Sequence, residues 1–276
     1  MAKLTTSVIS FSELDDLILL MQNTSGFDFA GYSKSSLKRR IQRIMDLERM
    51  DLVDLKNALV NIESFQAFLI NEVTVNVTEM FRDPQYYAAL AADVLPYLET
   101  YPRLKFWSAG CSTGEEVYSL AILLEEHGLY NRSFIYGTDI NSQVLETARK
   151  GIYPLKKIKT YSENYNASGA QHSLSDYYTA KYDAAIINTN IRKNILFSQH
   201  NLAGDYIFNE FQFISCRNVL IYFDLELQRK VFDLFYESLS EFGFLCLGSK
   251  ESLSNHEIIS KFKVINKEFN IYQKIK

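Results

Sequence analysis

The sequence predicts an α/β protein, in which a mostly parallel, doubly wound sheet follows an N-terminal domain made only of helices. Three observations support this fold class. Apolar residues in roughly the first seventy positions recur at helical spacing. After residue 104, short apolar runs alternate with amphipathic stretches, as in a parallel sheet covered on both faces. The 276 residues, of which 47% are hydrophobic, can bury a core without disulfides or metal.

The composition argues against several classes of protein. The net charge of −4 does not indicate a general attraction to nucleic acid. No run of about 18 apolar residues is present, so we do not expect membrane insertion. The beginning of the chain lacks the basic-then-apolar order of a signal peptide. Three widely spaced cysteines, Cys111, Cys216 and Cys246, argue against a disulfide framework and for a cytoplasmic location.

Residues 1–74 are expected to form the helical domain. The expected helices span residues 12–21, 33–50, 52–60 and 64–72, and Ser12 is a candidate N-cap of the first. The second helix carries a basic face opposite an apolar one. The apolar face consists of Leu37, Ile41, Ile44 and Met45.

Residues 75–276 are expected to form the sheet domain. Asp83-Pro84 looks like a helix start with proline at the first position. Helices are expected at residues 84–97, 115–128, 142–150 and 225–241, and strands at 105–108, 134–138, 211–215, 244–248, 262–265 and 269–274. Two segments break the alternation: 162–176 is polar and is expected to be an exposed loop, and about 180–198 is expected to form a small antiparallel β subdomain.

The loop between the first strand and the next helix, residues 109–116, is a candidate cofactor site. Gly110 and Gly114 allow close backbone approach, and Asp139 follows the second strand, where an acid suits ribose hydroxyls. The spacing fits neither a dinucleotide fingerprint nor a P-loop. Two acids beside the loop would repel a pyrophosphate but suit a ligand with hydroxyls and a cationic part, such as S-adenosylmethionine. The alternative is a tight turn without a ligand.

Several segments resemble the CheR family of chemotaxis receptor methyltransferases. TVNVTEMFR at residues 74–82 resembles the family's TxNxTxFFR, STGEEVYS at 112–119 its STGEEPYS, and CRNVLIYF at 216–223 its CRNVxIYF. GTDI at 137–140 and RKGIY at 149–153 also look like family segments. The resemblance spans roughly residues 12–276 and implies a Rossmann-like methyltransferase domain. It implies a protein-glutamate O-methyltransferase that esterifies receptor glutamates for sensory adaptation and releases S-adenosylhomocysteine, without a metal.

The resemblance also implies the site residues. Arg82 and Tyr222 would lie nearest the transferring methyl as catalytic residues. The cofactor would be bound by Asn76, Thr78, Arg82, Glu116, Asp139, Asn201, Leu202, Arg217 and Asn218. Simpler roles remain open: Arg82 in a surface ion pair, Asn76 and Thr78 as a helix N-cap pair, and Tyr222 in the core. Cys216, with no histidine near it in sequence, is better interpreted as a small buried hydrophobe than as a nucleophile.

The basic face of the second helix is the candidate docking surface for receptor methylation regions, which the resemblance implies are acidic coiled coils. Its cations are Lys34, Lys38, Arg39, Arg40 and Arg43. The alternative is a solvated helix face. Some family members grip a receptor C-terminal pentapeptide through a glycine-bearing β subdomain. Residues 179–197 contain no glycine, so we expect direct recognition of the methylation region instead.

Other functions remain open at this stage. One is a regulatory module that binds S-adenosylmethionine or its product but has lost turnover; the presence of Arg82 and Tyr222 argues against it. Others are a nicotinamide-dependent oxidoreductase on a similar sheet and a methyltransferase for a small carboxylic acid.

Overall fold

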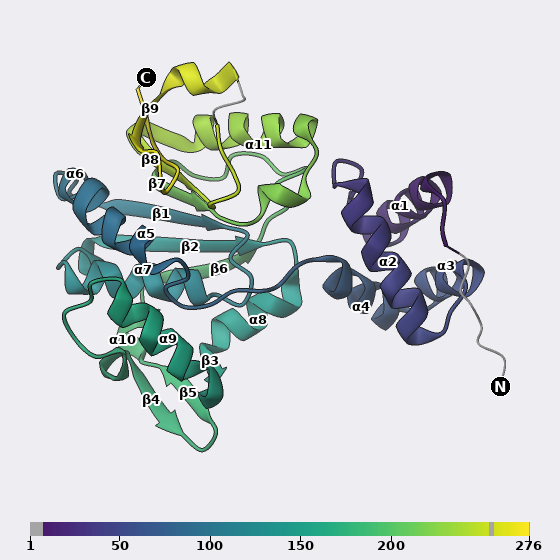
Figure 1. Cartoon of the computed structure of the whole chain (residues 1–276), viewed down its shortest axis with the longest axis horizontal. Helices are drawn as coiled ribbons and strands as arrows, with labels where there is room; N and C mark the ends of the chain where they lie inside the picture. Colours follow the sequence, from purple (N-terminus) through teal and green to yellow (C-terminus); the bar gives the residue numbers. More distant parts are fainter. Residues whose placement is uncertain (1–7, 254–256, 276) are drawn as a thin grey trace. The chain divides into compact units, whose positions relative to one another are not determined.

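The computed structural model describes residues 8–253 and 257–275. The chain forms two compact units (Figure 1). The helical unit comprises the chain up to Val75 together with the segment Ile221–Val231, and the sheet unit comprises Asn76–Leu220 and Phe232–Lys276. The helical unit therefore includes eleven residues that are distant in sequence from its four helices.

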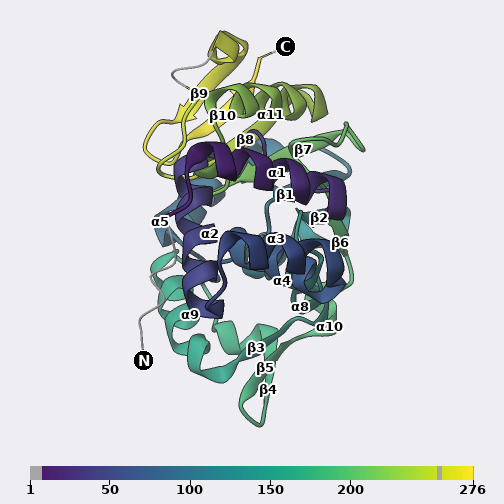
Figure 2. The ribbon, with the colours of Figure 1, turned by 90° about the vertical axis from the view of Figure 1, so that its right-hand side faces the viewer.

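The four helices of the helical unit are α1 (Phe11–Ser25), α2 (Lys34–Glu48), α3 (Leu52–Asn61) and α4 (Glu63–Val73), grouped together in Figure 2. The N-cap of α1 is Ser10, so the expectation of Ser12 was wrong. Ser10 and Glu13 form a capping box: Glu13 N–H donates to Ser10 Oγ at 3.2 Å, and Ser10 N–H donates to Glu13 Oε2 at 2.7 Å. The expected apolar face of α2 is confirmed, because all four of its residues are buried.

The sheet unit is built on a seven-stranded sheet in the order β6-β2-β1-β7-β8-β10-β9. Its strands are β1 (Leu104–Ala109), β2 (Ser133–Asp139), β6 (Ile195–Gln199), β7 (Phe211–Cys216), β8 (Leu239–Leu247), β9 (Phe262–Asn266) and β10 (Ile271–Lys274). The first five strands in the sheet order pair in parallel, and β10 runs antiparallel to both its neighbours. This topology, with its flanking helices, confirms the predicted fold class (Figure 1).

The helix expected at residues 84–97 is present but contains one wider turn. It consists of α5 (Pro84–Ala89), a π-helical turn η1 (Leu90–Val94) and α6 (Leu95–Leu98). Pro96 explains the turn, because it lacks an N–H and its ring clashes with an α-helical carbonyl of the preceding turn. The helices α7 (Glu115–Glu126), α8 (Ser142–Lys150) and α11 (Leu225–Ser238) occupy the expected segments.

The expectation of an exposed loop at residues 162–176 is wrong. The helix α9 (Leu155–Ala167) covers its first part, followed by the 3-10 helix η3 (Leu174–Tyr177). Ile158, Tyr161 and Tyr165 bury one face of α9. The hydroxyls of these two tyrosines donate to Glu115 and Glu126 of α7, so long-range contacts stabilise a helix whose sequence is otherwise polar.

The small antiparallel sheet is present, but its residues differ from those expected. It consists of β3 (Ile152–Pro154), β5 (Ala184–Ile187) and β4 (Tyr178–Lys181), and the β4–β5 hairpin projects from the sheet unit in Figure 1. Residues 195–199 instead form β6 at the edge of the large sheet, after the short helix α10 (Thr189–Arg192). Gly137 explains this placement, because a Cβ there would lie 2.7 Å from the ring of Phe197 in the paired strand.

Among the described residues, none of the helices is long and apolar enough to traverse a bilayer.

Candidate active site

The loop after β1 has a backbone that packing fixes. Gly110, Ser112 and Gly114 have φ values of 76°, 50° and 89°. A Cβ on Gly110 would lie 2.4 Å from Val219 Cγ2, and one on Gly114 would lie 2.8 Å from Ala148 Cβ. The two glycines are therefore required for contacts with the segment after β7 and with α8, whether or not a ligand is bound.

Asp139, at the carboxyl end of β2, holds this loop from the other side. Its Oδ2 accepts from Ser112 N–H at 2.8 Å, and its Oδ1 accepts from Asn141 N–H at 3.0 Å. Burial raises the pKa of Asp139, and these backbone hydrogen bonds oppose the increase. The Asp139 carbonyl accepts from His200 N–H at 3.1 Å, which brings the Asn201–Leu202 segment beside the ends of β1 and β2.

Asn201 shapes its own turn. Its side-chain oxygen accepts from Ala203 N–H at 3.0 Å, and its N–H donates to Asp205 Oδ2 at 2.7 Å. Its neighbour Leu202 is half-buried. The turn directly follows His200, whose N–H is bonded to the end of β2.

The two adjacent acids at the start of α7 differ in environment. Glu115 is fully buried and accepts from Thr113 Oγ1 at 2.6 Å and Tyr161 OH at 3.0 Å, so it ties α7 to α9. Glu116 Oε1 accepts from Ser108 Oγ at 2.9 Å, and its Oε2 lies 3.4 Å from Arg217 Nη1. Glu116 is the acid that connects the loop with the end of β7.

Arg217, which follows β7, is the buried cation of this site. Its Nη2 lies 2.7 Å from Asp83 Oδ2, and its guanidinium lies 3.9 Å from the ring centroid of Tyr86. Burial alone would lower the pKa of Arg217, but the surrounding phenol and carboxylate oxygens, Tyr86 and Glu116 foremost, raise it above its usual value. Arg217 is therefore a fixed positive charge between α5, α7 and β7.

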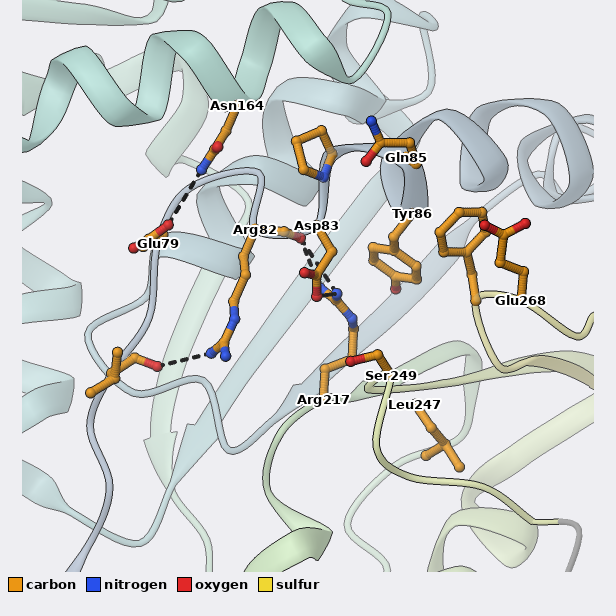
Figure 3. Close-up of a pocket in the computed structure, with 13 residues that line it drawn as sticks. Glu79, Arg82, Asp83, Gln85, Tyr86, Asn164, Arg217, Leu247, Ser249 and Glu268 are labelled. Carbon is orange, nitrogen blue, oxygen red and sulfur yellow. Dashed lines mark hydrogen bonds and ion pairs between the residues drawn. The ribbon is translucent and has the colours of Figure 1, made fainter.

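A cavity of about 600 Å³ opens beside Arg217, within the range of about 300–1,000 Å³ usual for small-molecule sites (Figure 3). Its lining brings together Arg82 and Arg217, and Asp83 and Tyr86, which both contact Arg217, also line it. Arg82 Nη1 donates to the Val77 carbonyl at 3.2 Å, so its described hydrogen bond is to the main chain rather than to a surface carboxylate.

Asn76 and Thr78 lie in the non-helical chain that leads to Arg82. The next helix, α5, begins at Pro84, with Asp83 in the N-cap position. The interpretation of Asn76 and Thr78 as an N-cap pair is therefore wrong.

Four of the eight non-glycine residues with positive φ in the described part of the chain lie in the segments 81–83, 112 and 218. Phe81, Asp83, Ser112 and Asn218 have positive φ values of 53°, 58°, 50° and 63°. Such conformations cost about 1–3 kcal/mol each in non-glycine residues and persist where the surroundings impose them. Phe81 N–H, for example, donates to the buried Ser119 Oγ at 2.8 Å. The surroundings of segments 81–83, 112 and 218 therefore hold these residues in conformations that are otherwise unfavourable.

The family models match nearly the whole chain. The CheR methyltransferase SAM binding domain matches residues 76–269, and the CheR methyltransferase all-alpha domain matches residues 12–74. The chain belongs to the CheR methyltransferase family.

Three relatives illustrate the range of similarity. The chain is 43% identical over 249 residues to "Putative methyltransferase Cher3" of Pseudomonas putida, covering 90% of this chain and 91% of the relative. It is 33% identical over 237 residues to a chemotaxis protein methyltransferase of Listeria monocytogenes, covering 83% of this chain and 86% of the relative. It is 31% identical over 248 residues to the Salmonella typhimurium chemotaxis protein methyltransferase, covering 86% of this chain and 82% of the relative.

The residues of this CheR domain suit S-adenosylmethionine. Asp139 and Glu116 offer carboxylates to hydroxyl or ammonium groups, and the cavity offers Arg82 to a carboxylate. Two acids in the first turn of α7 oppose the pyrophosphate that a nicotinamide cofactor would place at that helix end. The donor set therefore fits a sulfonium amino acid with a ribose better than a dinucleotide.

Sequence reasoning missed Glu251, a buried acid after β8. Its carboxylate accepts backbone N–H groups of Gly248 at 2.7 Å and of Asn218 and Val219 at 2.8 Å each. It therefore fixes the chain that carries Arg217 and Asn218. An acid three residues after a predicted strand was the available signal, and it lies outside the family motifs.

Tyr222 and Cys216 lie in different surroundings. Tyr222 is half-exposed, so it is not a core residue, and it belongs to the helical unit of the CheR chain. Cys216 is fully buried, and burial raises the pKa of its thiol, as expected for a packing residue rather than a nucleophile.

The five cations expected on α2 do not share one environment. Lys34 forms an ion pair with Asp15 at 2.8 Å. Arg40 is half-buried, with its guanidinium 5.8 Å from the ring centroid of Tyr222. The other three, Lys38, Arg39 and Arg43, line a groove of about 560 Å³ together with apolar side chains that include Phe11 and Leu47.

Proposed function

We propose that this CheR protein is a protein-glutamate O-methyltransferase that converts glutamates of chemotaxis receptors into 5-O-methyl esters and releases S-adenosylhomocysteine. The observation that carries the proposal is the set of carboxylates and guanidiniums around the strained loop, in a chain of the CheR family. Relatives named chemotaxis protein methyltransferase, such as the one from Listeria monocytogenes, support the receptor as acceptor.

The proposed cofactor contacts follow from the chemistry of each side chain. Asp139 would hold ribose hydroxyls, and Glu116 the amino or ribose end. Arg82 would hold the amino-acid carboxylate through a charge-assisted contact. Asn201 and Leu202 would border the adenine. Asn76, Thr78, Arg217 and Asn218 would complete the pocket, with Arg217 already anchored by Asp83.

The reaction is an in-line displacement on the methyl group that bound S-adenosylmethionine supplies on its sulfonium. An acceptor glutamate has an ordinary pKa of about 4.3 and is ionised at neutral pH, so no general base is required. The protein therefore has to align the acceptor oxygen and exclude water. We assign Tyr222 to this alignment, with its hydroxyl donating to the acceptor carboxylate.

The groove on α2 would dock the acceptor. Receptor methylation regions are expected to be acidic helices, and Lys38, Arg39 and Arg43 supply complementary charge beside exposed apolar side chains. Phe11, of which 52% is exposed, and Leu47, of which 62% is exposed, would contact the apolar side chains of such a helix.

The decisive experiment looks for the product on the acceptor. Membranes that carry a candidate chemotaxis receptor are incubated with the protein and S-adenosylmethionine, and receptor peptides are analysed by mass spectrometry. We expect methyl esters on glutamates that mild base removes. Binding of S-adenosylhomocysteine in calorimetry without any methyl ester on receptors would instead indicate a regulatory module, and esters only on small carboxylic acids would replace the proposed acceptor.

A further inference from the structure

The segment that carries Tyr222 is joined to the start of α2. Ser33 N–H donates to the Tyr222 carbonyl at 2.7 Å, and Asp224 N–H donates to the Gly31 carbonyl at 2.9 Å. The central residues of the two segments form an antiparallel bridge. Residues 31–33 and 222–224 therefore form a short strand-like pair immediately before the docking helix.

Side chains reinforce this pair. The rings of Tyr32 and Phe223 meet edge to face at 5.0 Å between centroids. A Cβ on Gly31 would lie 2.8 Å from Leu227 Cβ, so only glycine allows this approach. Both contacts lie within the helical unit, and they make residues 222–227 a part of it.

Arg40 contacts the Tyr222 ring directly. Its guanidinium carbon lies 5.8 Å from the ring centroid, within the distance of about 6 Å at which a cation is attracted to an aromatic face. Its Nη1 also donates weakly to the Glu72 carbonyl at 3.5 Å, and its Nε is buried without a hydrogen bond to any described residue. The ring is therefore a principal partner of this half-buried cation.

Arg39, the preceding residue, provides the contrast. It is exposed and lines the groove with Lys38 and Arg43, whereas Arg40 turns toward α4 and Tyr222. Successive residues of an α-helix point about 100° apart, so adjacent arginines of α2 necessarily serve different faces.

We propose that Arg40 is a positioning residue that holds the Tyr222 ring for the acceptor docked on the same helix. This inference rests on the proposed function, since it takes Tyr222 as the group that orients the acceptor carboxylate. One face of α2 binds the acceptor helix, and the other fixes the ring whose hydroxyl meets the acceptor glutamate. Docking and alignment are then coupled through a single rigid helix.

The test compares Arg40→Gln with Arg40→Lys and with Arg39→Gln, which removes one charge at the adjacent exposed position. Initial rates are measured on receptor-bearing membranes at varied membrane concentration. We expect Arg40→Gln to lower kcat roughly threefold to tenfold, with KM and S-adenosylhomocysteine affinity retained. Arg40→Lys should recover most of the rate because an ammonium also attracts the ring. Arg39→Gln should act on KM.

A double-mutant cycle with Tyr222→Leu shows whether Arg40 acts through the ring. Without the ring, Arg40→Gln should lower kcat no further, and melting temperatures of the four proteins should be non-additive. Equal effects of Arg40→Gln with and without Tyr222, or an effect confined to KM, would overturn this inference alone. If the parent chain esterifies no receptor although it binds S-adenosylhomocysteine, the proposed function fails first and this inference with it.

Discussion

At the scale of single residues, the site consists of charges that the fold holds in place before any ligand arrives. Asp139 is held by two backbone N–H groups, and Arg217 by Asp83 and Glu116. A preorganised arrangement of this kind reduces the cost of ordering side chains when a ligand binds. Arg82 differs, because its described hydrogen bond is a single one to a main-chain carbonyl, and it remains available at the cavity.

Tyr222→Phe tests the proposed role of the tyrosine hydroxyl most directly. It removes the hydroxyl proposed to orient the acceptor but keeps the ring beside Arg40. A hydrogen bond to a charged group contributes about 1.5–3 kcal/mol, so kcat should fall roughly tenfold to a hundredfold. Calorimetry should show unchanged affinity for S-adenosylhomocysteine. An unaltered rate would exclude the assigned role.

At the scale of elements, two loops at the carboxyl ends of parallel strands meet through buried contacts. The loop after β1 packs on the segment after β7 through Gly110 and Val219. Glu251, after β8, binds the same segment through backbone N–H groups. With Asp139 at the end of β2, the site is therefore built by four neighbouring strands, which explains why changes remote from the ligand should alter it.

Gly110→Ala should destabilise the fold and weaken the cofactor site. The new Cβ would lie 2.4 Å from Val219 Cγ2, and the alanine would have to adopt a φ of 76°. Left-handed backbone and overpacking together predict a loss of roughly 2–4 kcal/mol in the free energy of unfolding, measured by denaturant titration. Gly128→Ala is the matched control, since φ there is 68° but nothing lies within 4 Å of the added Cβ. Equal losses in the two variants would show that the contact with Val219 is unimportant.

Glu251→Gln tests the anchor after β8. The amide nitrogen would face backbone donors, so at least one of the hydrogen bonds to Gly248, Asn218 and Val219 should be lost. We expect a loss of about 1–3 kcal/mol in stability, together with weaker S-adenosylhomocysteine binding in calorimetry. Glu257→Gln, at an exposed position, should change neither. Retained affinity in Glu251→Gln would separate this acid from the site.

At the scale of the whole molecule, the residues with proposed roles are divided between two units. The sheet unit contains Asp139, Glu116, Arg82 and Arg217, whereas Tyr222 belongs to the helical unit that bears the groove on α2. The proposed docking surface and the proposed aligning tyrosine therefore belong to one unit, and the proposed cofactor-binding charges belong to the other. Acceptor and cofactor affinity should accordingly respond to different substitutions.

The double variant Arg39→Glu, Arg43→Glu should raise KM for receptor-bearing membranes roughly tenfold at low salt and reduce the salt dependence of the rate. Both side chains are exposed at the groove. Calorimetric affinity for S-adenosylhomocysteine should remain unchanged. The control is the double variant Lys156→Glu, Lys159→Glu on α9. It introduces the same change in net charge at exposed positions and should leave KM nearly constant. Similar effects of both pairs would point to net charge rather than to docking.

The sequence by itself determined the order of most elements, the strand-to-helix loop, Asp139 and the family resemblance, because helical periodicity, glycine spacing and motif order are local properties. The tertiary structure decided what depends on long-range contacts. The polar segment 162–176 largely became helical because buried tyrosines of α9 contact α7, and residues 195–199 joined the large sheet because Gly137 admits Phe197. The same limit applies to Glu251 and to the contrast between Arg39 and Arg40, since burial and partners distant in the chain leave no periodic signal.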